Sequence, residues 1–222
     1  MDRPQALKFE DDGGILPVHS VGIEVSGRFP MSGWDLDYVG NLANGRGPIP
    51  DAVQGVSDLN RQKALALKLS LTRSGARSVS LGPSIYHDLI PAEPTVPGRE
   101  GEIRELIPGA HFVYRDPAVE LIAEATRVHH EDRVSGLVFD HLAGYAVAGI
   151  TLGDWTPYAG VDQIDFDPGD LFFAGMDTDL TRVLAGVRYA VSHANTIKVE
   201  YRHDDRPTGA IHVFAVQSAF AF

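Results

Sequence analysis

The sequence predicts an all-β fold of long antiparallel strands, and three observations carry this prediction. Polar and apolar residues alternate with a period of two along most of the chain, helical periodicity is hard to find, and the 23 glycines and 14 prolines gather between the alternating runs. Alternation places successive side chains on opposite faces of a strand, whereas glycine and proline mark turns. A large all-β unit usually forms one domain, so residues 1–222 are expected to be a single domain.

Eleven strands are expected, preceded by an outer loop or irregular segment over residues 1–19. The strands cover residues 20–29, 33–43, 62–72, 77–87, 106–114, 118–128, 136–150, 155–165, 180–192, 196–203 and 210–222. Strands in soluble proteins usually have about 5–6 residues, whereas a tilted strand needs about 9–11 residues to cross a bilayer. The expected lengths therefore favour a membrane-spanning sheet.

The strands of the N-terminal half set apolar residues against charged or small ones. In the first strand, valine and isoleucine alternate with Glu24 and Arg28, and in the third strand four leucines alternate with alanine, Lys68 and serine. The fourth strand also alternates, but it contains Pro83, which lacks the N–H group that a central strand uses. A bulge or a shifted boundary is one way to accommodate this proline.

The sixth and seventh strands continue the pattern. Glu120 and Glu124 alternate with valine, leucine and alanine in the sixth, although the segment contains good helix formers. If the seventh strand keeps one register, His141 projects toward its apolar face together with Phe139 and Tyr145. A histidine on a lipid-facing surface is unexpected, and a bulge or shifted boundary also removes this conflict.

The last three strands alternate most clearly. Valine, isoleucine and tyrosine stand opposite Arg188 in the ninth strand and opposite Lys198, Glu200 and Arg202 in the tenth. Counting back in twos from Phe222 gives a large, mostly aromatic face in the final strand, and the residues between are small or polar. Such a strand separates two different environments.

Charged residues thus gather on the face opposite the apolar one, strand after strand. In a membrane barrel the apolar face contacts lipid and the polar face lines the lumen. The residues expected to line the lumen are Glu24, Arg28, Lys68, Glu120, Glu124, Arg188, Lys198, Glu200 and Arg202. Aromatic residues near strand ends are expected to form interfacial girdles; they are Trp34, Tyr38, Tyr114, Trp155, Tyr158 and Tyr201.

The connections alternate between short turns and long polar loops, as in an up-and-down transmembrane barrel. Eleven strands are an odd number, whereas bacterial single-chain barrels have an even number. At least one strand is therefore expected to precede this chain. The sequence predicts that the chain contributes about 11–12 strands and forms the C-terminal part of a larger barrel. Met1 is followed by no apolar leader, so the true N-terminus is expected to be missing.

Composition excludes several classes. The formal net charge of −11 argues against non-specific binding of nucleic acid. Cysteine is absent, which excludes disulfides and cysteine-based zinc or thiol chemistry. No run reaches the roughly 18 apolar residues of a transmembrane helix. The mean hydropathy of −0.08 is compatible with a membrane barrel, which hides its apolar face in alternation.

The chain as a whole resembles the Gram-negative outer-membrane porin-like β-barrel proteins. The stretches that carry the resemblance are residues 14–19, 40–47, 155–158, 185–189 and 198–203, together with the aromatic C-terminal strand. The resemblance covers nearly the whole chain but not the N-terminal portion of the family. It implies a location in the outer membrane and passive passage of ions or small polar solutes through a charged lumen.

The same resemblance implies partners. They are the lipid bilayer and lipopolysaccharide, the barrel-assembly machinery through the C-terminal strand that ends at Phe222, small polar solutes, and a second copy if the protein forms a homo-oligomer. Nucleic acid is not expected. The transported solute and the charge selectivity stay open.

The search for reactive groups gives no catalytic, metal or cofactor site. Four aspartates within 162–170 have the wrong spacing for an EF-hand and are interpreted as solvated loop acids. The segments 129–132 and 203–205 offer metal-ligand types without the spacing of a zinc site, and both are expected in exposed loops. No Gly-x-Ser-x-Gly or phosphate-binding loop occurs. The chain is therefore expected not to be an enzyme.

One alternative remains at the sequence level. A soluble or surface-exposed β-barrel or sandwich that binds a small ligand also fits alternating strands. Detergent dependence separates the two interpretations, because a membrane barrel needs detergent and a binding module does not.

Overall fold

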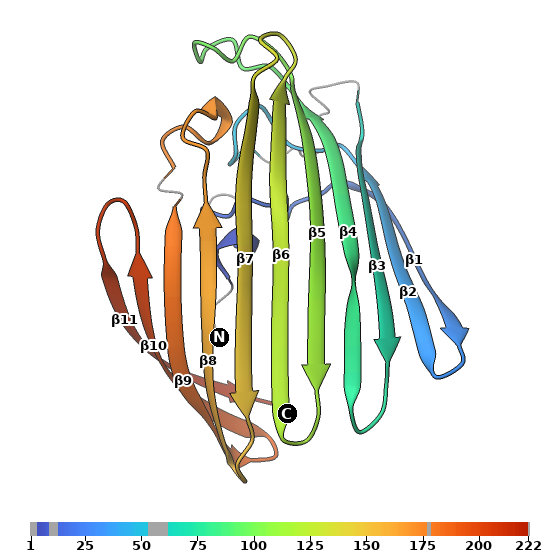
Figure 1. Ribbon diagram of the computed structural model, residues 1–222, viewed down its shortest axis with the longest axis vertical. Coiled ribbons are helices and arrows are strands. Elements are labelled where there is room, and N and C mark those ends of the chain that lie inside the picture. The colour runs from blue at the N-terminus through green and yellow to red at the C-terminus, as the bar shows by residue number, and fades with distance from the viewer. Residues whose placement is uncertain (1–3, 9–12, 53–61, 177–178, 222) are drawn as a thin grey trace.

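The computed structural model describes residues 4–8, 13–52, 62–176 and 179–221, and its strands form a single antiparallel sheet (Figure 1). Neighbours in sequence are neighbours in space throughout, from β1 to β11. The strands are β1 (Gly22–Met31), β2 (Trp34–Ala43), β3 (Ala64–Arg73), β4 (Ser78–Ile90), β5 (Ile103–Arg115), β6 (Val119–Asp132), β7 (Val138–Ile150), β8 (Trp155–Asp165), β9 (Leu180–Ser192), β10 (Asn195–Asp205) and β11 (Ile211–Phe220). Two short 3-10 turns, η1 (Gln5–Leu7) and η3 (Leu171–Phe173), lie outside the sheet.

The predicted all-β, up-and-down topology and its eleven strands are confirmed. The predicted bounds of β8 and β9 coincide with the observed ones, whereas β4, β5 and β6 extend further than predicted. The extensions contain polar residues such as Asp88, Glu105 and His130, which the sequence analysis assigned to loops. These side chains are buried inside the fold. A polar residue at these positions is therefore not evidence of an exposed loop.

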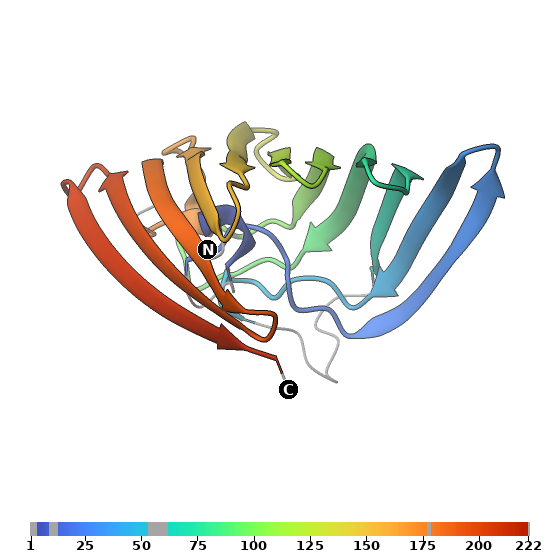
Figure 2. The same ribbon diagram turned by 90° about the horizontal axis from the view of Figure 1, so that it is seen from below.

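The sheet curves into a trough (Figure 2). Short turns join strands at one end, here called the turn end, and longer connections join them at the other, the loop end (Figure 1). Among the described strands, no ladder joins β1 to β11, so each of these two pairs with one neighbour. No helix in the described part of the chain is long and apolar enough to cross a membrane.

The convex face of the trough is apolar except toward the loop end, where charged side chains such as Arg104 and Asp140 are exposed on it. Over the rest of this face large hydrophobic side chains project outward and remain exposed, with Ile23 at 68% and Phe214 at 79%. Others on this face are Val25, Phe29, Leu65, Leu67, Leu81, Ile85, Phe112, Leu121, Leu142, Val161, Val183, Val199, Val216 and Phe220. A continuous apolar surface of this kind marks contact with a membrane or another apolar partner.

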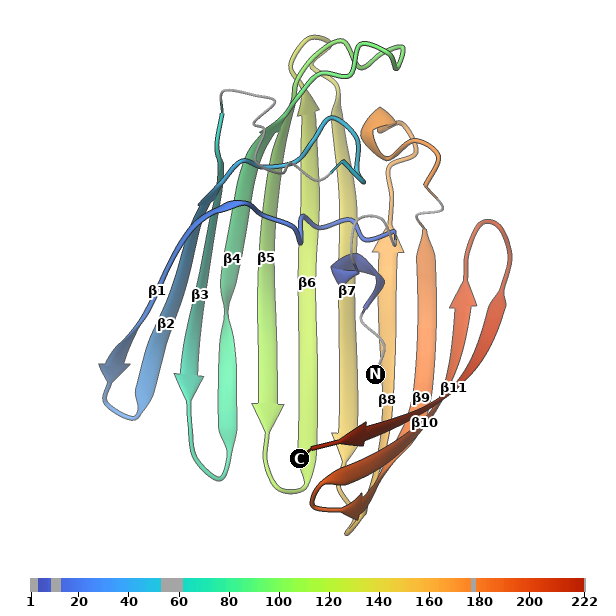
Figure 3. The same cartoon turned by 180° about the vertical axis from the view of Figure 1, so that it is seen from behind.

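The concave face is divided into two regions. Toward the loop end, residues 4–8, 13–18, 44–52 and 166–176 fold into the trough and cover the sheet (Figure 3). They build an apolar core with the strand residues beneath them, consisting of Ala6, Ile15, Ile90, Ile103, Ile107, Val128, Ala143, Ile164, Phe166, Phe172, Phe173 and Leu180. Toward the turn end, the concave face carries charged and polar side chains.

Three expectations about single residues are corrected. Pro83 stays within β4 without a bulge: it faces outward, and the β3–β4 ladder is interrupted between the pairs Lys68–Ser84 and Leu71–Leu81 without a change of register. His141 is fully buried on the concave side, because the alternation of β7 turns Leu142 outward instead. Tyr158 is also buried inside the trough and cannot belong to an interfacial girdle.

Candidate functional site

The nine residues predicted to line a lumen all lie on the concave face. Alternation places each of them opposite the exposed hydrophobic residues of its own strand. The strand register brings some of them together, because Lys198 of β10 lies directly opposite Arg188 of β9 in the antiparallel ladder. The concave face of β6, β9 and β10 therefore carries several ionisable groups side by side.

These groups form a mixed-charge network. The Arg188 guanidinium contacts a carboxylate oxygen of Glu120 at 2.8 Å, and the ammonium of Lys198 lies 3.4 Å from Glu200. The hydroxyl of Tyr158 donates a hydrogen bond to Glu200 at 2.7 Å. The side chains of Arg188 and Glu120 are 42% and 28% exposed, whereas those of Lys198 and Glu200 are buried. Opposite charges held on one wall leave a polar surface without large net charge.

The other predicted lining residues stand apart from this network. Arg28 of β1 pairs with Asp37 of β2 at 2.6 Å, and Glu124 accepts a hydrogen bond from Tyr145 at 3.3 Å. Glu24, Lys68 and Arg202 also face the concave side, on β1, β3 and β10. The structure thus distributes the nine residues over the wall and concentrates four of them near β9.

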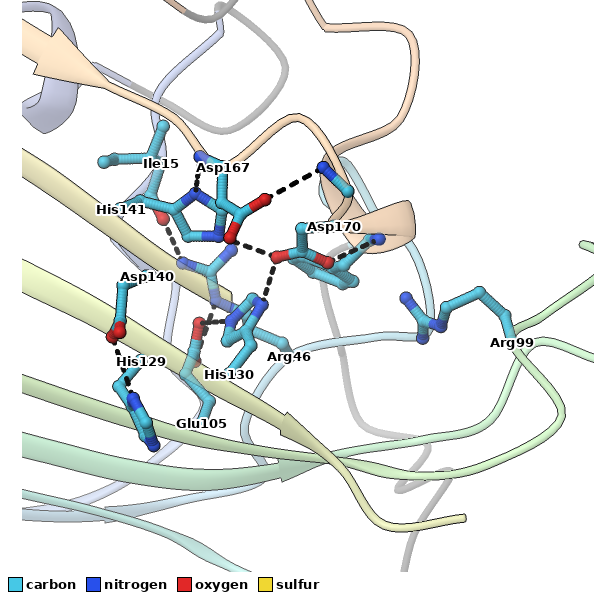
Figure 4. A network of polar contacts seen from close by, with 12 residues as sticks. Ile15, Arg46, Arg99, Glu105, His129, His130, Asp140, His141, Asp167 and Asp170 are labelled. Carbon is cyan, nitrogen blue, oxygen red and sulfur yellow. Dashed lines mark hydrogen bonds and ion pairs between the residues drawn. The ribbon is translucent and has the colours of Figure 1, made fainter. Parts of the chain in front are cut away.

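A second polar cluster was missed by the sequence analysis. The loop clamp consists of Arg46, Glu105, His130, His141 and Asp170, all 5% exposed or less (Figure 4). His130 Nδ1 lies 2.6 Å and His141 Nε2 lies 2.7 Å from Asp170 Oδ2. His130 Nε2 lies 3.0 Å from Glu105 Oε1, and Arg46 pairs with Glu105 at 3.1 Å.

The loop clamp fastens two loops to three strands. Glu105, His130 and His141 belong to β5, β6 and β7, whereas Arg46 and Asp170 come from the β2–β3 and β8–β9 connections. Phe166, Phe172 and Phe173 pack around the two histidine rings at centroid distances of 4.6–5.4 Å. Apolar walls strengthen the electrostatic contacts inside, because little water is present to screen them.

The loop environment sets the ionisation of Asp170 and Arg99. Burial alone raises the pKa of the Asp170 carboxyl, but hydrogen bonds from His130 and His141 outweigh it and hold that pKa well below its usual range. Burial lowers the pKa of the Arg99 guanidinium, although the negative charges of Asp170 and Asp132 act to raise it. Asp170 is therefore ionised, and its carboxylate is the shared hydrogen-bond partner of both histidine rings.

Two histidines and an aspartate are also the ligand types of a zinc site, and these donor atoms lie within 4.8 Å of one another. Two observations disfavour a metal. The backbone N–H of Asp167 points at Nδ1 of His141 at 3.2 Å, so the ring proton lies on Nε2, the atom that would face the ion. Arg46 adds a positive charge beside the cluster. Hydrogen bonds therefore organise this cluster.

A third cluster, the N-terminal seat, consists of Gln5, Asp162, Arg182 and Asp204. Arg182 contacts both carboxylate oxygens of Asp204 at 2.6 Å and Asp162 at 3.3 Å. The backbone N–H of Gln5 donates to Asp162 Oδ2 at 2.8 Å. All four side chains are buried, so residues far apart in sequence are joined inside the trough.

The predicted loop acids and histidines are thus corrected. Asp162 and Asp170 are buried in separate clusters rather than solvated, and only Asp165 and Asp167 of that group lie outside them. His130 and Asp204 are buried as well, although both segments that contain them were expected to be exposed loops. Sequence offers one signal for three of them: His130, Asp162 and Asp204 continue the period-two alternation of their strands. Asp170 lies in the β8–β9 connection, where no alternation predicts its burial.

One serine–histidine contact also occurs on the concave face. Ser70 Oγ lies 3.2 Å from His111 Nε2, which are the atoms of a nucleophile and its base. The nearest acid in the register, Glu124, lies opposite His111 but hydrogen-bonds Tyr145. Within the described part of the chain, the contact is therefore a pair without the oriented third member of a hydrolase triad.

Comparison with solved structures identifies the architecture. OmpTdeltaL8, a loop L8 deletion mutant of OmpT, an outer membrane protein of Vibrio cholerae, matches 89% of this chain with a TM-score of 0.56 and 14% identity. A porin matches 88% of the chain with a TM-score of 0.53 and 16% identity. The fold is that of an outer-membrane β-barrel. The predicted resemblance in fold is confirmed.

The outer-membrane barrels that match are longer than this chain, which covers 62% and 60% of their lengths. No protein-family model matches the sequence, and no curated protein matches it either. The eleven strands described here thus correspond to a part of the wall of such a barrel.

Proposed function

We propose that this chain forms wall strands of an outer-membrane channel in a Gram-negative bacterium, through which ions or small polar solutes pass passively. The observation that carries the proposal is the division of the sheet into an apolar convex face and a concave face with ionisable residues at the turn end. Lipid then contacts the convex face, and water and solutes contact the concave one.

Charged side chains along a pore select solutes by charge and size. The network around Glu120, Arg188, Lys198 and Glu200 presents both signs on one wall, held in fixed geometry by ion pairs. Ion pairs held in place orient water and solute dipoles, but they do not bind a single ion tightly. Such a surface favours passage of solutes over their retention. Passage rather than catalysis is the function that this wall supports.

The proposal includes the partners implied by the fold. The convex face contacts the bilayer and, on the outer leaflet, lipopolysaccharide. The assembly machinery recognises the C-terminal strand, which the structure describes as β11 up to Phe220, while Phe222 lies outside the described residues. A homo-oligomer through the convex face is a further proposal of the same kind.

Charge reversal in the lining tests the channel. Arg188→Glu, Lys198→Glu and Arg202→Glu together should shift ion preference toward cations, because fixed charges act at short range in a narrow pore where salt screens less. Reversal potentials across a planar bilayer under a salt gradient measure the shift. The matched control reverses Arg104, an exposed residue on the outward face of β5, and should leave the preference unchanged.

Two outcomes contradict the proposal. Channels with an unchanged reversal potential in the triple variant show that these residues do not line the conducting path. Absence of conductance in every form of the folded protein favours the alternative, a surface module that binds a small ligand. A sandwich module is already disfavoured because the described strands form one sheet rather than two packed sheets.

A further inference from the structure

An ion pair on the concave face joins two strands that are not neighbours. Arg188 of β9 lies 2.8 Å from Glu120 of β6, although β7 and β8 separate these strands in the sheet. The curvature of the trough brings the two side chains together (Figure 2). The pair and the strands between them border a cavity of about 150 Å³, here called the strut pocket, whose polar side consists of Glu120, Tyr158, Arg188 and Lys198.

Lys198 brings a buried cation to the strut pocket. It is 6% exposed, and within the described part of the chain its ammonium has one acceptor, an oxygen of Glu200 at 3.4 Å. An ammonium group has three N–H donors, and a buried donor without an acceptor is costly. Arg188 lies directly opposite Lys198 in the ladder, where like charges repel each other. The two cations therefore favour an anion beside them.

The charges around the strut pocket do not cancel. Glu120 binds Arg115 through Oε1 and Arg188 through Oε2, both at 2.8 Å. Glu200 is likewise held at one oxygen by two hydrogen bonds. The ionised groups of the lining and their direct ion-pair partners are three cations and two carboxylates, namely Arg115, Arg188, Lys198, Glu120 and Glu200. One positive charge is left for a ligand to neutralise.

The opposite side of the strut pocket is apolar. Ile122 lines it from β6, and Val147 and Gly149 line it from β7. An apolar cavity of about 150 Å³ holds benzene, which has about the size of a three-carbon acid. The occupant that fits both sides is therefore a small organic anion with a short carbon chain, rather than a bare ion.

We propose that the strut pocket binds small monocarboxylates. The carboxylate lies beside Arg188 and Lys198, because a guanidinium group matches a carboxylate in geometry as well as charge, and the carbon chain lies against Ile122 and Val147. Binding is weak and reversible, as passage requires a solute to leave its site. The inference names the solute class of the proposed channel and rests on that function for passage, whereas binding itself needs no current.

Three probes of equal size test the charge of the ligand. Lactate, zwitterionic alanine and neutral lactamide have the same number of non-hydrogen atoms and differ in charge. Saturation-transfer NMR with the full chain in detergent micelles should show binding of lactate and no binding of lactamide. Alanine should bind about tenfold more weakly than lactate, because its ammonium group meets the excess positive charge.

Two variants test the site itself. Arg188→Gln removes one of the two cations, and Gly149→Val fills the strut pocket while every charge stays in place. A Cβ atom at Gly149 would lie 3.5 Å from both Thr156 and Tyr158, which is ordinary van der Waals contact. Each variant should weaken lactate binding by about tenfold or more. Arg73→Gln, at the exposed end of β3, is the matched control and should bind lactate like wild type.

Heat-modifiable migration in gels confirms that each variant has folded, and the outcomes are then distinct. Equal binding of lactate and lactamide, or wild-type affinity in either folded variant, overturns the site. Tighter binding of alanine than of lactate overturns the assignment to monocarboxylates. Lactate binding that responds to both variants, in a protein that gives no conductance in planar bilayers, supports the site and overturns the channel function.

Discussion

Single buried charges decide how the loops attach to the wall. Asp170 contacts two histidine rings at 2.6 and 2.7 Å while almost fully withdrawn from water. Arg46 donates a hydrogen bond to the Ile15 carbonyl, pairs with Glu105 and stacks over Phe172 at 5.5 Å. Gly45 beside it has a φ of +82° and a side chain there would collide with Asp88, so only glycine fits this turn.

Removing the charge of Asp170 should loosen the loop clamp. Asp170→Asn should lower the free energy of unfolding at pH 7 by about 3 kcal/mol, the cost of leaving a buried partner unpaired. Urea unfolding in lipid vesicles, followed by tryptophan fluorescence, measures the change. Asp165→Asn on the exposed outward face of β8 is the control and should change it little.

The effect of Asp170→Asn should depend on pH in one direction. The folded-state pKa of Asp170 lies below its usual 3.8, so the carboxylate stabilises the fold above that usual value. This stabilisation declines as the pH falls through the depressed folded-state pKa. The difference between wild type and variant should therefore persist at pH 5 and shrink toward pH 2. A constant difference over this range contradicts the ionic role.

At the scale of elements, the strands owe their length and orientation to alternation. Leu67 on β3 and Val187 on β9 lie mid-strand on the apolar convex face, and each has one charged neighbour in sequence, Lys68 and Arg188, on the concave side. The 3-10 turns and long connections carry no such alternation. They are positioned by buried contacts with strands remote in sequence, such as that of Gln5 with Asp162.

Charge insertion tests which face meets lipid. Leu67→Arg and Val187→Arg should each impair assembly, because an arginine near the bilayer midplane on the outer face of a barrel costs about 2–4 kcal/mol. Folding into lipid vesicles, followed by heat-modifiable migration, measures it. Ser26→Arg on the concave face of β1 is the control, which should fold like wild type. If both convex variants fold as well as the control, the assignment of faces is wrong.

At the scale of the whole molecule, the apolar convex surface dominates behaviour in water. The exposed hydrophobic residues form one continuous face across all eleven strands. A surface of this kind promotes association when neither lipid nor detergent covers it.

The protein should therefore need detergent to remain dispersed. Size-exclusion chromatography with light scattering should give a defined species in detergent and large aggregates after detergent removal, while circular dichroism retains strand signal. A monodisperse species without detergent contradicts a lipid-facing convex surface and favours a ligand-binding module. Leu67→Lys together with Leu65→Lys should reduce the aggregation, since both side chains are about half-exposed on that face.

How far the sequence predicts the site depends on the range of the interactions. The concave placement of Lys68, Arg188 and Glu200 follows from counting in twos, because side-chain direction in a strand is a local property. The clustering of Arg188 with Lys198 also follows once neighbouring strands pair. The loop clamp does not follow, because Asp170 and Glu105, which are 65 positions apart in sequence, bind the same His130 ring only when the trough has formed.

The sequence by itself determined the strands, their order and the two faces, since alternation, turn residues and adjacent pairing act between neighbours along the chain. Only the tertiary structure decided which polar residues are buried, because His130, His141 and Asp162 look like surface residues until remote segments fold over them. It also decided where the loops go. A loop has no periodicity to read, and its position is fixed by contacts whose partners lie far away in the chain.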